Sequence, residues 1–235
     1  GLGDRVIAYQ TGAGATGEWV KDTAMERYCG DYSEPMRQHF RAWLRERYQG
    51  DLGSLRAAWN SDAVTFDTAE VPSAEEQHRT QAGSLRDPRK ERSVIDYYAC
   101  LGELCGGLVS GFCQTVKEAS QGRALAGAFF GYLPELAWNG SFFGGGPDSD
   151  ISAVQRSGHL GLAVALRSPH VDFIVSPYSY GFRGIGGHGP AMPPSESLRL
   201  HNKLFLFEED SRACTAQDQD YGRVYTVDHS IAVLQ

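Results

Sequence analysis

Apolar residues along this chain occur in two patterns, short continuous runs and longer stretches with helical spacing. The short runs lie in residues 5–10, 124–130, 171–175 and 203–207, and polar residues stand only at their ends or, at Asp172, once inside. A short apolar run without alternation is typical of a strand that is buried on both faces. The pattern therefore predicts four buried strands, and a carboxylate cluster begins at Glu208, directly after the last of them.

Helical spacing fills most of the chain between these runs. The predicted helices are residues 33–48, 52–59, 93–116, 157–166 and 195–201. Ser33 before Glu34-Pro35 reads as an N-cap, Gly50 as a C-terminal glycine, and Ser93 as the cap of the longest helix. Residues 64–92 are polar and contain two prolines, so we expect an excursion rather than a core element.

The longest predicted helix has a single apolar stripe and several glycines. The stripe is Val94, Tyr98, Leu101, Cys105, Leu108, Phe112 and Val116. It should face the core. Gly106, Gly107 and Gly111 weaken the helix but allow a neighbour to pack closely against it.

The order of the elements predicts the fold class. Buried strands that alternate with helices indicate an α/β fold with a parallel sheet. Long loops follow the strands and short ones precede them, as in a TIM barrel, whose active site lies at the C-terminal face. Because a closed barrel needs about eight strands, we predict one domain over 1–235 that is a partial (β/α)8 barrel. Its open edges favour a homo-oligomer or pairing with the missing strands.

Composition narrows the function classes. The net charge of −7 over 235 residues argues against nucleic acid as a partner. No membrane segment is expected, because no stretch of ~18 residues is apolar and uncharged. The odd number of cysteines predicts packed thiols rather than disulfides. The Cys and His residues do not have the spacing of a zinc site, so we expect no metal and no cofactor. The thiols, together with the lack of a signal-peptide pattern, favour the cytoplasm.

Two carboxylates carry the main functional hypothesis. Glu18 follows the first predicted strand and Glu208 follows the last. Retaining glycosidases need a nucleophile and an acid/base whose carboxyl groups lie ~5–5.5 Å apart. The alternatives are an exposed loop acid for Glu18 and an ion pair with Arg212 for Glu208. Asp210 and Arg212 are expected to orient the nucleophile or to form an ordinary ion pair.

Aromatic residues crowd the loops that follow the strands. They are Trp19, Tyr132, Trp138, Phe142, Phe143, Tyr178, Tyr180 and Phe182. Sugars stack on aromatic rings, so we expect Trp19, Tyr132, Trp138, Tyr178 and Tyr180, with Arg183, to bind substrate. The alternative is that some of the rings only fill the top of the barrel. Residues 184–189 are expected to form a mobile loop over the site.

Two further motifs have other readings. Gly12, Gly14 and Gly17 match the spacing of a dinucleotide-binding fingerprint. That motif needs a helix at its last glycine and a second strand that ends in an acid, and neither is predicted here. Asn139-Gly140-Ser141 matches a glycosylation acceptor but lacks a secretory context.

The sequence resembles clan A glycoside hydrolases, most closely the family 42 β-galactosidases. The matching segments are residues 6–10, 18–19, 40–48, 55–59, 176–180 and 196–212. The resemblance covers the middle of that family's barrel, from strand four to strand seven.

The resemblance implies a retaining mechanism on a β-glycoside such as a β-galactoside. It places Glu18 at the acid/base position and Glu208 at the nucleophile position. In our interpretation, Tyr178 or Tyr180 supports the nucleophile. One residue departs from the pattern, since Gly17 stands where the family usually has Asn. A non-catalytic fragment that binds carbohydrate or self-assembles is the alternative function.

Overall fold

The computed structural model describes residues 5–21, 30–78, 85–138, 153–179 and 189–208, which form an α/β fold around one parallel sheet. The four strands are β1 (Ala8–Thr11), β2 (Leu125–Phe129), β3 (Phe173–Ser176) and β4 (Leu204–Phe207). Their order in the sheet is the order in the chain, β1-β2-β3-β4. The predicted fold class and strands are confirmed to this level.

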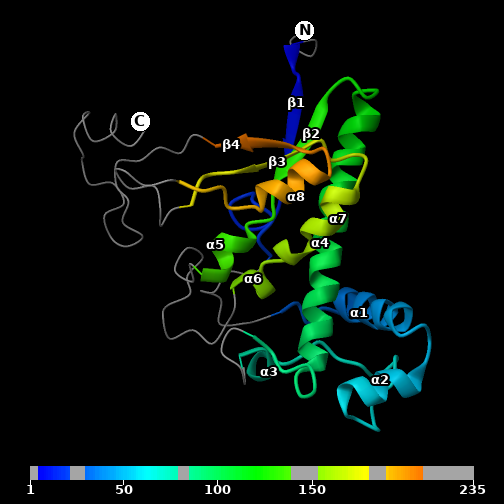
Figure 1. The fold of residues 1–235 in the computed structure, drawn as a ribbon. Helices are drawn as coiled ribbons and strands as arrows, with labels where there is room; N and C mark the ends of the chain where they lie inside the picture. The colour runs from blue at the N-terminus through cyan, green and yellow to red at the C-terminus, as the bar shows by residue number, and fades with distance from the viewer. Residues whose placement is uncertain (1–4, 22–29, 79–84, 139–152, 180–188, 209–235) are drawn as a thin grey trace.

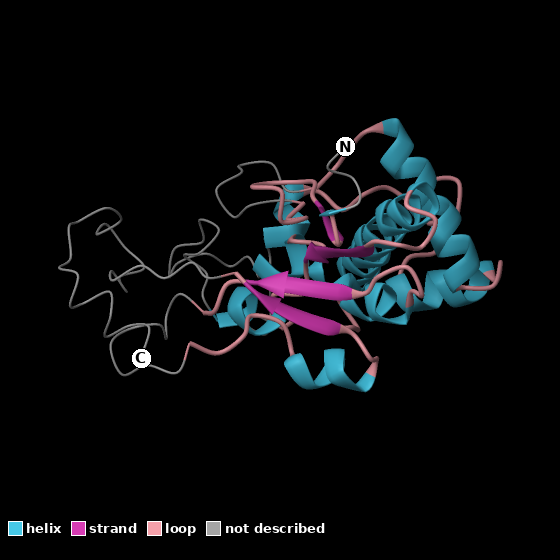
Figure 2. Cartoon of the chain, turned by 90° about the horizontal axis from the view of Figure 1, so that it is seen from above, coloured by secondary structure: helices cyan, strands magenta, loops and turns pink. Residues whose placement is uncertain are grey.

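All strand pairs are parallel, so the carboxyl ends of the four strands lie at one edge of the sheet. Ala8 pairs with Leu125, Gly127 with Phe173, and Phe173 with Leu204. Seen from above, successive strands are rotated relative to one another, the usual twist of a sheet (Figure 2). We call the edge formed by the carboxyl ends and the loops that follow them the C-terminal rim.

The long helix α4 (Arg92–Ala119) packs against the sheet and connects it to the other helices (Figure 1). Helices α1 (Glu34–Arg47), α2 (Leu52–Trp59) and α3 (Ala74–His78) gather around its N-terminal end. Along its length α4 contacts α6 (Ala153–Arg156), the 3-10 helix η2 (His159–Gly161) and α7 (Leu162–Arg167). The remaining helices, α5 (Leu133–Trp138) and α8 (Ser195–Leu200), follow β2 and precede β4. Most buried apolar side chains form one cluster around α4.

The first helix begins where its capping residues predict. The Ser33 side chain accepts a hydrogen bond from the Met36 amide, and Pro35 stands in the first turn. Buried Asp96 of α4 then holds α1 and α2 in place, because it accepts hydrogen bonds from Tyr48 at 2.6 Å and Trp59 at 2.8 Å. These bonds satisfy a carboxylate that is buried at a helix junction.

The segment between α2 and α4 is part of the core, which corrects the prediction of an excursion. Val64, Phe66, Ala69 and Val71 are buried in the main cluster. Gln77 is fully buried as well, and its side chain bonds to Tyr98 at 2.8 Å. The polar composition of residues 64–92 led to a wrong prediction, because isolated apolar side chains in an irregular segment give no periodic pattern.

Helix α4 also differs from its prediction in its start and in its buried face. It begins at Arg92 after Glu91, so Ser93 lies within the first turn and is not the cap. Leu108 and Phe112 are 44% and 49% exposed, whereas Val109 and Cys113 are buried. The predicted stripe repeats every seven residues, and such a repeat drifts around a straight helix by ~20° per heptad.

By length and composition α4 could cross a membrane, although the sequence predicts no such segment. In this fold it is a central helix with eleven buried residues, and it contacts the sheet, α7 and helices on several sides. A core helix passes the same test of length and apolar content, so the helix alone does not indicate a membrane protein.

Strand β4 is more exposed than predicted. Leu204, Leu206 and Phe207 are 51%, 42% and 51% exposed. β4 is the last strand of the described sheet, so one of its sides has no neighbouring strand in the described residues. An apolar run predicts burial on both faces only when elements cover both.

Candidate functional site at the C-terminal rim

The loop after β1 brings Glu18 back to the C-terminal rim. Gly14 and Gly17 have positive φ values of 71° and 80°, and a bridge pairs Ala15 with Val20. No helix starts at Gly17 within the described residues up to Lys21, so the dinucleotide fingerprint lacks its structural context. The turn presents the Glu18 side chain, which is half-buried, toward the loop that follows β2.

Two hydroxyl groups hold the Glu18 carboxylate. The Tyr132 hydroxyl donates to Oε1 at 3.0 Å, and Thr16 donates a short hydrogen bond to Oε2. Tyr132 follows β2 and its side chain is fully buried. Because Tyr132 lies 114 residues further along the chain, this contact depends on the parallel pairing of β1 with β2. It sets the orientation of the carboxylate.

A buried histidine supports both ends of this contact. His159 Nδ1 lies 3.1 Å from the backbone nitrogens of both Gly131 and Tyr132, so it accepts their hydrogens. Nε2 therefore carries the proton and donates to the Glu18 carbonyl oxygen at 3.0 Å. Burial lowers the pKa of His159 to about 3, although the bond to Glu18 opposes the shift. The neutral His159 ring therefore connects the loop after β1 to the loop after β2 by hydrogen bonds.

Glu135 is a second carboxylate at the rim and, unlike half-buried Glu18, it is buried; the sequence analysis did not predict it. It lies in the first turn of α5, directly after β2, and is 1% exposed. The Ser179 hydroxyl, from the loop after β3, donates a short hydrogen bond to it. The sequence signal for Glu135 is an acidic residue directly after Leu133-Pro134, at the start of a short helix that follows a buried strand.

Glu208 leaves the sheet at the end of β4. Its backbone nitrogen donates to the Ser176 carbonyl at 2.9 Å, which continues the pairing with β3 by one residue. The residue is exposed. Two strands, β2 and β3, separate β4 from β1. At a strand spacing of ~4.8 Å, the two outer backbones lie roughly 14 Å apart along the sheet.

The aromatic residues predicted to bind substrate have different surroundings. Trp19 is buried, donates to the Thr11 carbonyl at 3.0 Å and packs edge-on against Phe112 at 5.3 Å. These contacts make it part of the core. Tyr178 is half-buried, with its ring 6.0 Å from that of Phe207. Tyr178 is therefore the better placed of the two for a ligand at the rim.

Other predicted site residues lie where the structure gives no side-chain description. Trp138 is the last residue of α5, and nothing is described of its side chain. The rest fall outside the described residues: Tyr180, Arg183, Asp210, Arg212, the aromatics 142, 143 and 182, the motif 139–141, and residues 184–188 of the predicted loop. Their roles stay predictions.

Three cysteines on α4 are buried free thiols, as predicted. They are Cys100, Cys105 and Cys113. Burial raises the pKa of Cys100 to about 12 and also raises that of Cys113, so neither is a reactive thiolate. Cys29 and Cys214 lie outside the described residues. In the described part of the chain, no three His, Cys, Asp or Glu side chains gather into a metal site.

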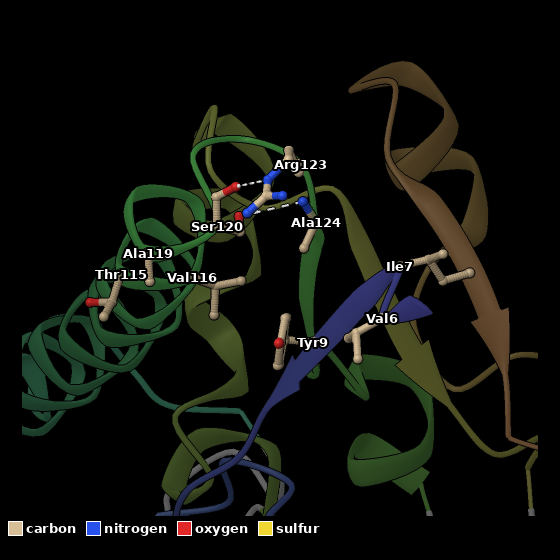
Figure 3. Close-up of a pocket in the computed structure, with 9 residues that line it drawn as sticks. All are labelled: Val6, Ile7, Tyr9, Thr115, Val116, Ala119, Ser120, Arg123 and Ala124. Carbon is tan, nitrogen blue, oxygen red and sulfur yellow. Dashed lines mark hydrogen bonds between the residues drawn. The ribbon is translucent and has the colours of Figure 1, made fainter. Parts of the chain in front are cut away.

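A cavity of about 660 Å³ lies at the opposite end of the sheet, beside the side of β1 that has no neighbouring strand among the described residues (Figure 3). One wall is Val6, Ile7 and Tyr9, and the other is the end of α4 from Thr115 to Ser120. Its lining is mainly apolar, with Arg123 at one side. The cavity contains no carboxylate, so the candidate chemistry belongs to the C-terminal rim.

Comparisons of the chain with protein-family models, with curated proteins and with solved structures found no match. The site itself is therefore the basis for a functional proposal.

Proposed function

We propose that this chain is the catalytic region of a retaining glycoside hydrolase that acts on β-glycosides, with Glu18 as acid/base and Glu208 as nucleophile. The observation that supports the proposal most is the Glu18 carboxylate, held by Tyr132 and Thr16 at the rim where β4 releases Glu208. The parallel sheet in sequential order is compatible with part of a (β/α)8 barrel, in which this rim carries the active site.

In this mechanism Glu208 attacks the anomeric carbon while Glu18 protonates the leaving oxygen. Glu18 then removes a proton from the water that hydrolyses the glycosyl ester. Tyr132 bonds one carboxylate oxygen at 3.0 Å and so fixes the direction in which the other faces. Barrel curvature must bring the two carboxyl groups from the strand separation of roughly 14 Å to the ~5.5 Å that a retaining pair needs.

The test is hydrolysis of aryl β-glycosides, beginning with an aryl β-galactoside, by the full chain. Glu208→Ala should abolish turnover, and added formate should restore it by attacking the anomeric carbon in place of the missing carboxylate. Glu18→Gln should lower kcat by roughly 10²–10⁴-fold, the usual contribution of a general acid/base. Glu196→Gln is the matched control, because that side chain is 75% exposed on α8. Unchanged turnover in either site variant would remove that residue from the mechanism.

A second candidate is a non-catalytic fragment that binds carbohydrate or self-assembles, and the edge of β1, which no other described strand covers, favours it. Val6, Ile7 and Tyr9 are 40%, 77% and 47% exposed there, beside the cavity in Figure 3. An apolar strand edge is a template for pairing with another strand. Absence of hydrolysis over a broad glycoside panel, combined with stable association, would favour this candidate over the enzyme.

A further inference from the structure

Arg156 is a buried cation for which the described part of the chain supplies no hydrogen-bond partner. It is the last residue of α6 and is only 1% exposed. In the described part of the chain, Nε, Nη1 and Nη2 have no hydrogen-bond acceptor. The cation–π contacts of the described residues involve other arginines.

This arrangement is costly, and arginine cannot reduce the cost by losing its proton. A buried lysine or histidine can become neutral, whereas a guanidinium stays charged with all its donors. Buried charges in proteins are normally paired. An acceptor supplied by a ligand would explain why the sequence places arginine here.

The position of Arg156 ties it to the C-terminal rim. The following residue, Ser157, accepts a hydrogen bond at 2.9 Å from the Lys21 amide in the segment that carries Glu18. Ala153, one turn earlier in α6, packs with Tyr132, Leu136 and Met192. The backbone that carries Arg156 is therefore part of the wall formed by the loops after β1, β2 and β3.

None of the three carboxylates described at the rim serves as the missing acceptor. Glu18 bonds to Tyr132 and Thr16, and Glu135 bonds to Ser179. Glu208 also has an interaction of its own. None of the three lies within hydrogen-bonding distance of Arg156. The acceptor must come from outside the described residues.

We propose that Arg156 binds the carboxylate of a sugar acid, so that the substrates are β-glycosides of a uronic acid. One guanidinium matches one carboxylate in charge, and its fork of donors matches the two oxygens. A doubly charged phosphate fits less well, since the rim already carries three carboxylates and the chain has a net charge of −7. That the bound sugar acid is part of a substrate rests on the proposed glycosidase function. Binding of a carboxylate at Arg156 can be tested without catalysis.

The binding test measures thermal unfolding of the full chain with D-glucuronate, D-galacturonate, D-galactose or inorganic phosphate. A uronate at about a hundredfold its Kd should raise Tm by roughly 5–10 °C, and galactose should not. In Arg156→Met the uronate Kd should rise by roughly 10- to 100-fold, the range for a lost charge-assisted bond. Arg89→Met removes the same charge from a side chain that is 89% exposed and should bind like the wild type.

Stability without ligand gives a second, independent readout. Removal of an unpaired buried cation should leave the Tm of Arg156→Met equal to or above that of the wild type. A large drop would show an internal partner and overturn the proposal. If Arg156→Met does not fold, Arg156→Lys is used, and it should weaken uronate binding at least about tenfold, because it lacks the fork.

The remaining outcomes separate this proposal from the proposed function. Equal uronate binding by wild type and Arg156→Met overturns the carboxylate site, as does an equal or larger effect of phosphate. Uronate binding that depends on Arg156, without hydrolysis of any aryl glycuronide, supports the site and counts against the glycosidase. Hydrolysis of galactosides without uronate binding supports the glycosidase function and overturns the carboxylate site.

Discussion

At the residue scale, the rim depends on a few buried polar side chains that each join two loops. His159 bonds to the loops after β1 and β2. Tyr132 bonds to Glu18, and Ser179 joins the loop after β3 to Glu135. Because these groups are buried, each hydrogen bond both orients a side chain and satisfies a polar atom that water cannot reach.

The buried neutral state of His159 predicts that stability falls in mild acid. Its pKa is about 3 in the folded chain against 6.5 for an unperturbed histidine. The unfolded chain therefore binds a proton first, and the free energy of unfolding should fall by roughly 1.4 kcal/mol per pH unit below pH 6.5. Above pH 6.5 the stabilisation that comes from keeping His159 neutral is fully present.

Urea denaturation of His159→Gln and wild type at pH 7, 6 and 5 measures this effect. The variant should be less stable at pH 7 but should show a shallower loss between pH 6 and pH 5. His201→Gln is the control, because it removes an exposed imidazole. Parallel pH profiles for His159→Gln and wild type would mean that the native histidine titrates normally.

At the element scale, the close approach of α4 to η2 sets where His159 stands. A Cβ on Gly106 would meet the Gly161 carbonyl oxygen at 2.4 Å and the Val164 Cβ at 2.9 Å. Gly161 is the last residue of η2, which begins at His159. The glycine in α4 therefore controls how near the histidine comes to the sheet.

This contact predicts opposite effects for two adjacent glycines. Gly106→Ala should destabilise the fold by roughly 1–3 kcal/mol, because the methyl group overpacks a backbone contact. Gly107→Ala should stabilise it by roughly 0.5–1 kcal/mol, since a Cβ there has no neighbour within 4 Å and alanine favours helix. Denaturation midpoints of the two variants check the pair. Stabilisation by both would show that α4 and η2 are not in close contact.

At the scale of the whole molecule, the described sheet has apolar residues at both of its outer strands. Ile7 is 77% exposed beside β1, and Leu204 and Phe207 are each 51% exposed on β4. Exposed strand edges of this kind promote association. The rim and the β1 cavity lie at opposite ends of the strands, so association at that cavity would leave the rim open (Figure 3).

We therefore expect the purified chain to associate through the edge of β1, and a charge placed there should oppose it. Ile7→Lys should lower the average mass measured by light scattering, because a lysine blunts an exposed strand edge. Arg199→Met, on the exposed surface of α8, is the control. A wild-type chain that is monomeric at high concentration would count against association at this edge.

Local pattern was enough to predict most elements. The four apolar runs became β1 to β4, and Ser33 with Pro35 marked the start of α1. These signals are local, since a cap bonds to a residue three positions away and a buried parallel strand needs a continuous apolar run. Glu18 and Glu208 were likewise placed after their strands by sequence order, and the parallel pairing brings those strand ends to one rim.

The sequence by itself determined the α/β class of the fold and the edge of the sheet at which Glu18 and Glu208 lie. Only the tertiary structure decided which polar groups lie together. Tyr132 and His159 are each more than a hundred residues from Glu18 in the chain, and His159 is 28 residues from Gly131. The tertiary structure also decided that Val109 and Cys113 of α4 face the core and that β4 is exposed. Burial is set by which elements become neighbours, and no periodic pattern within one element records that.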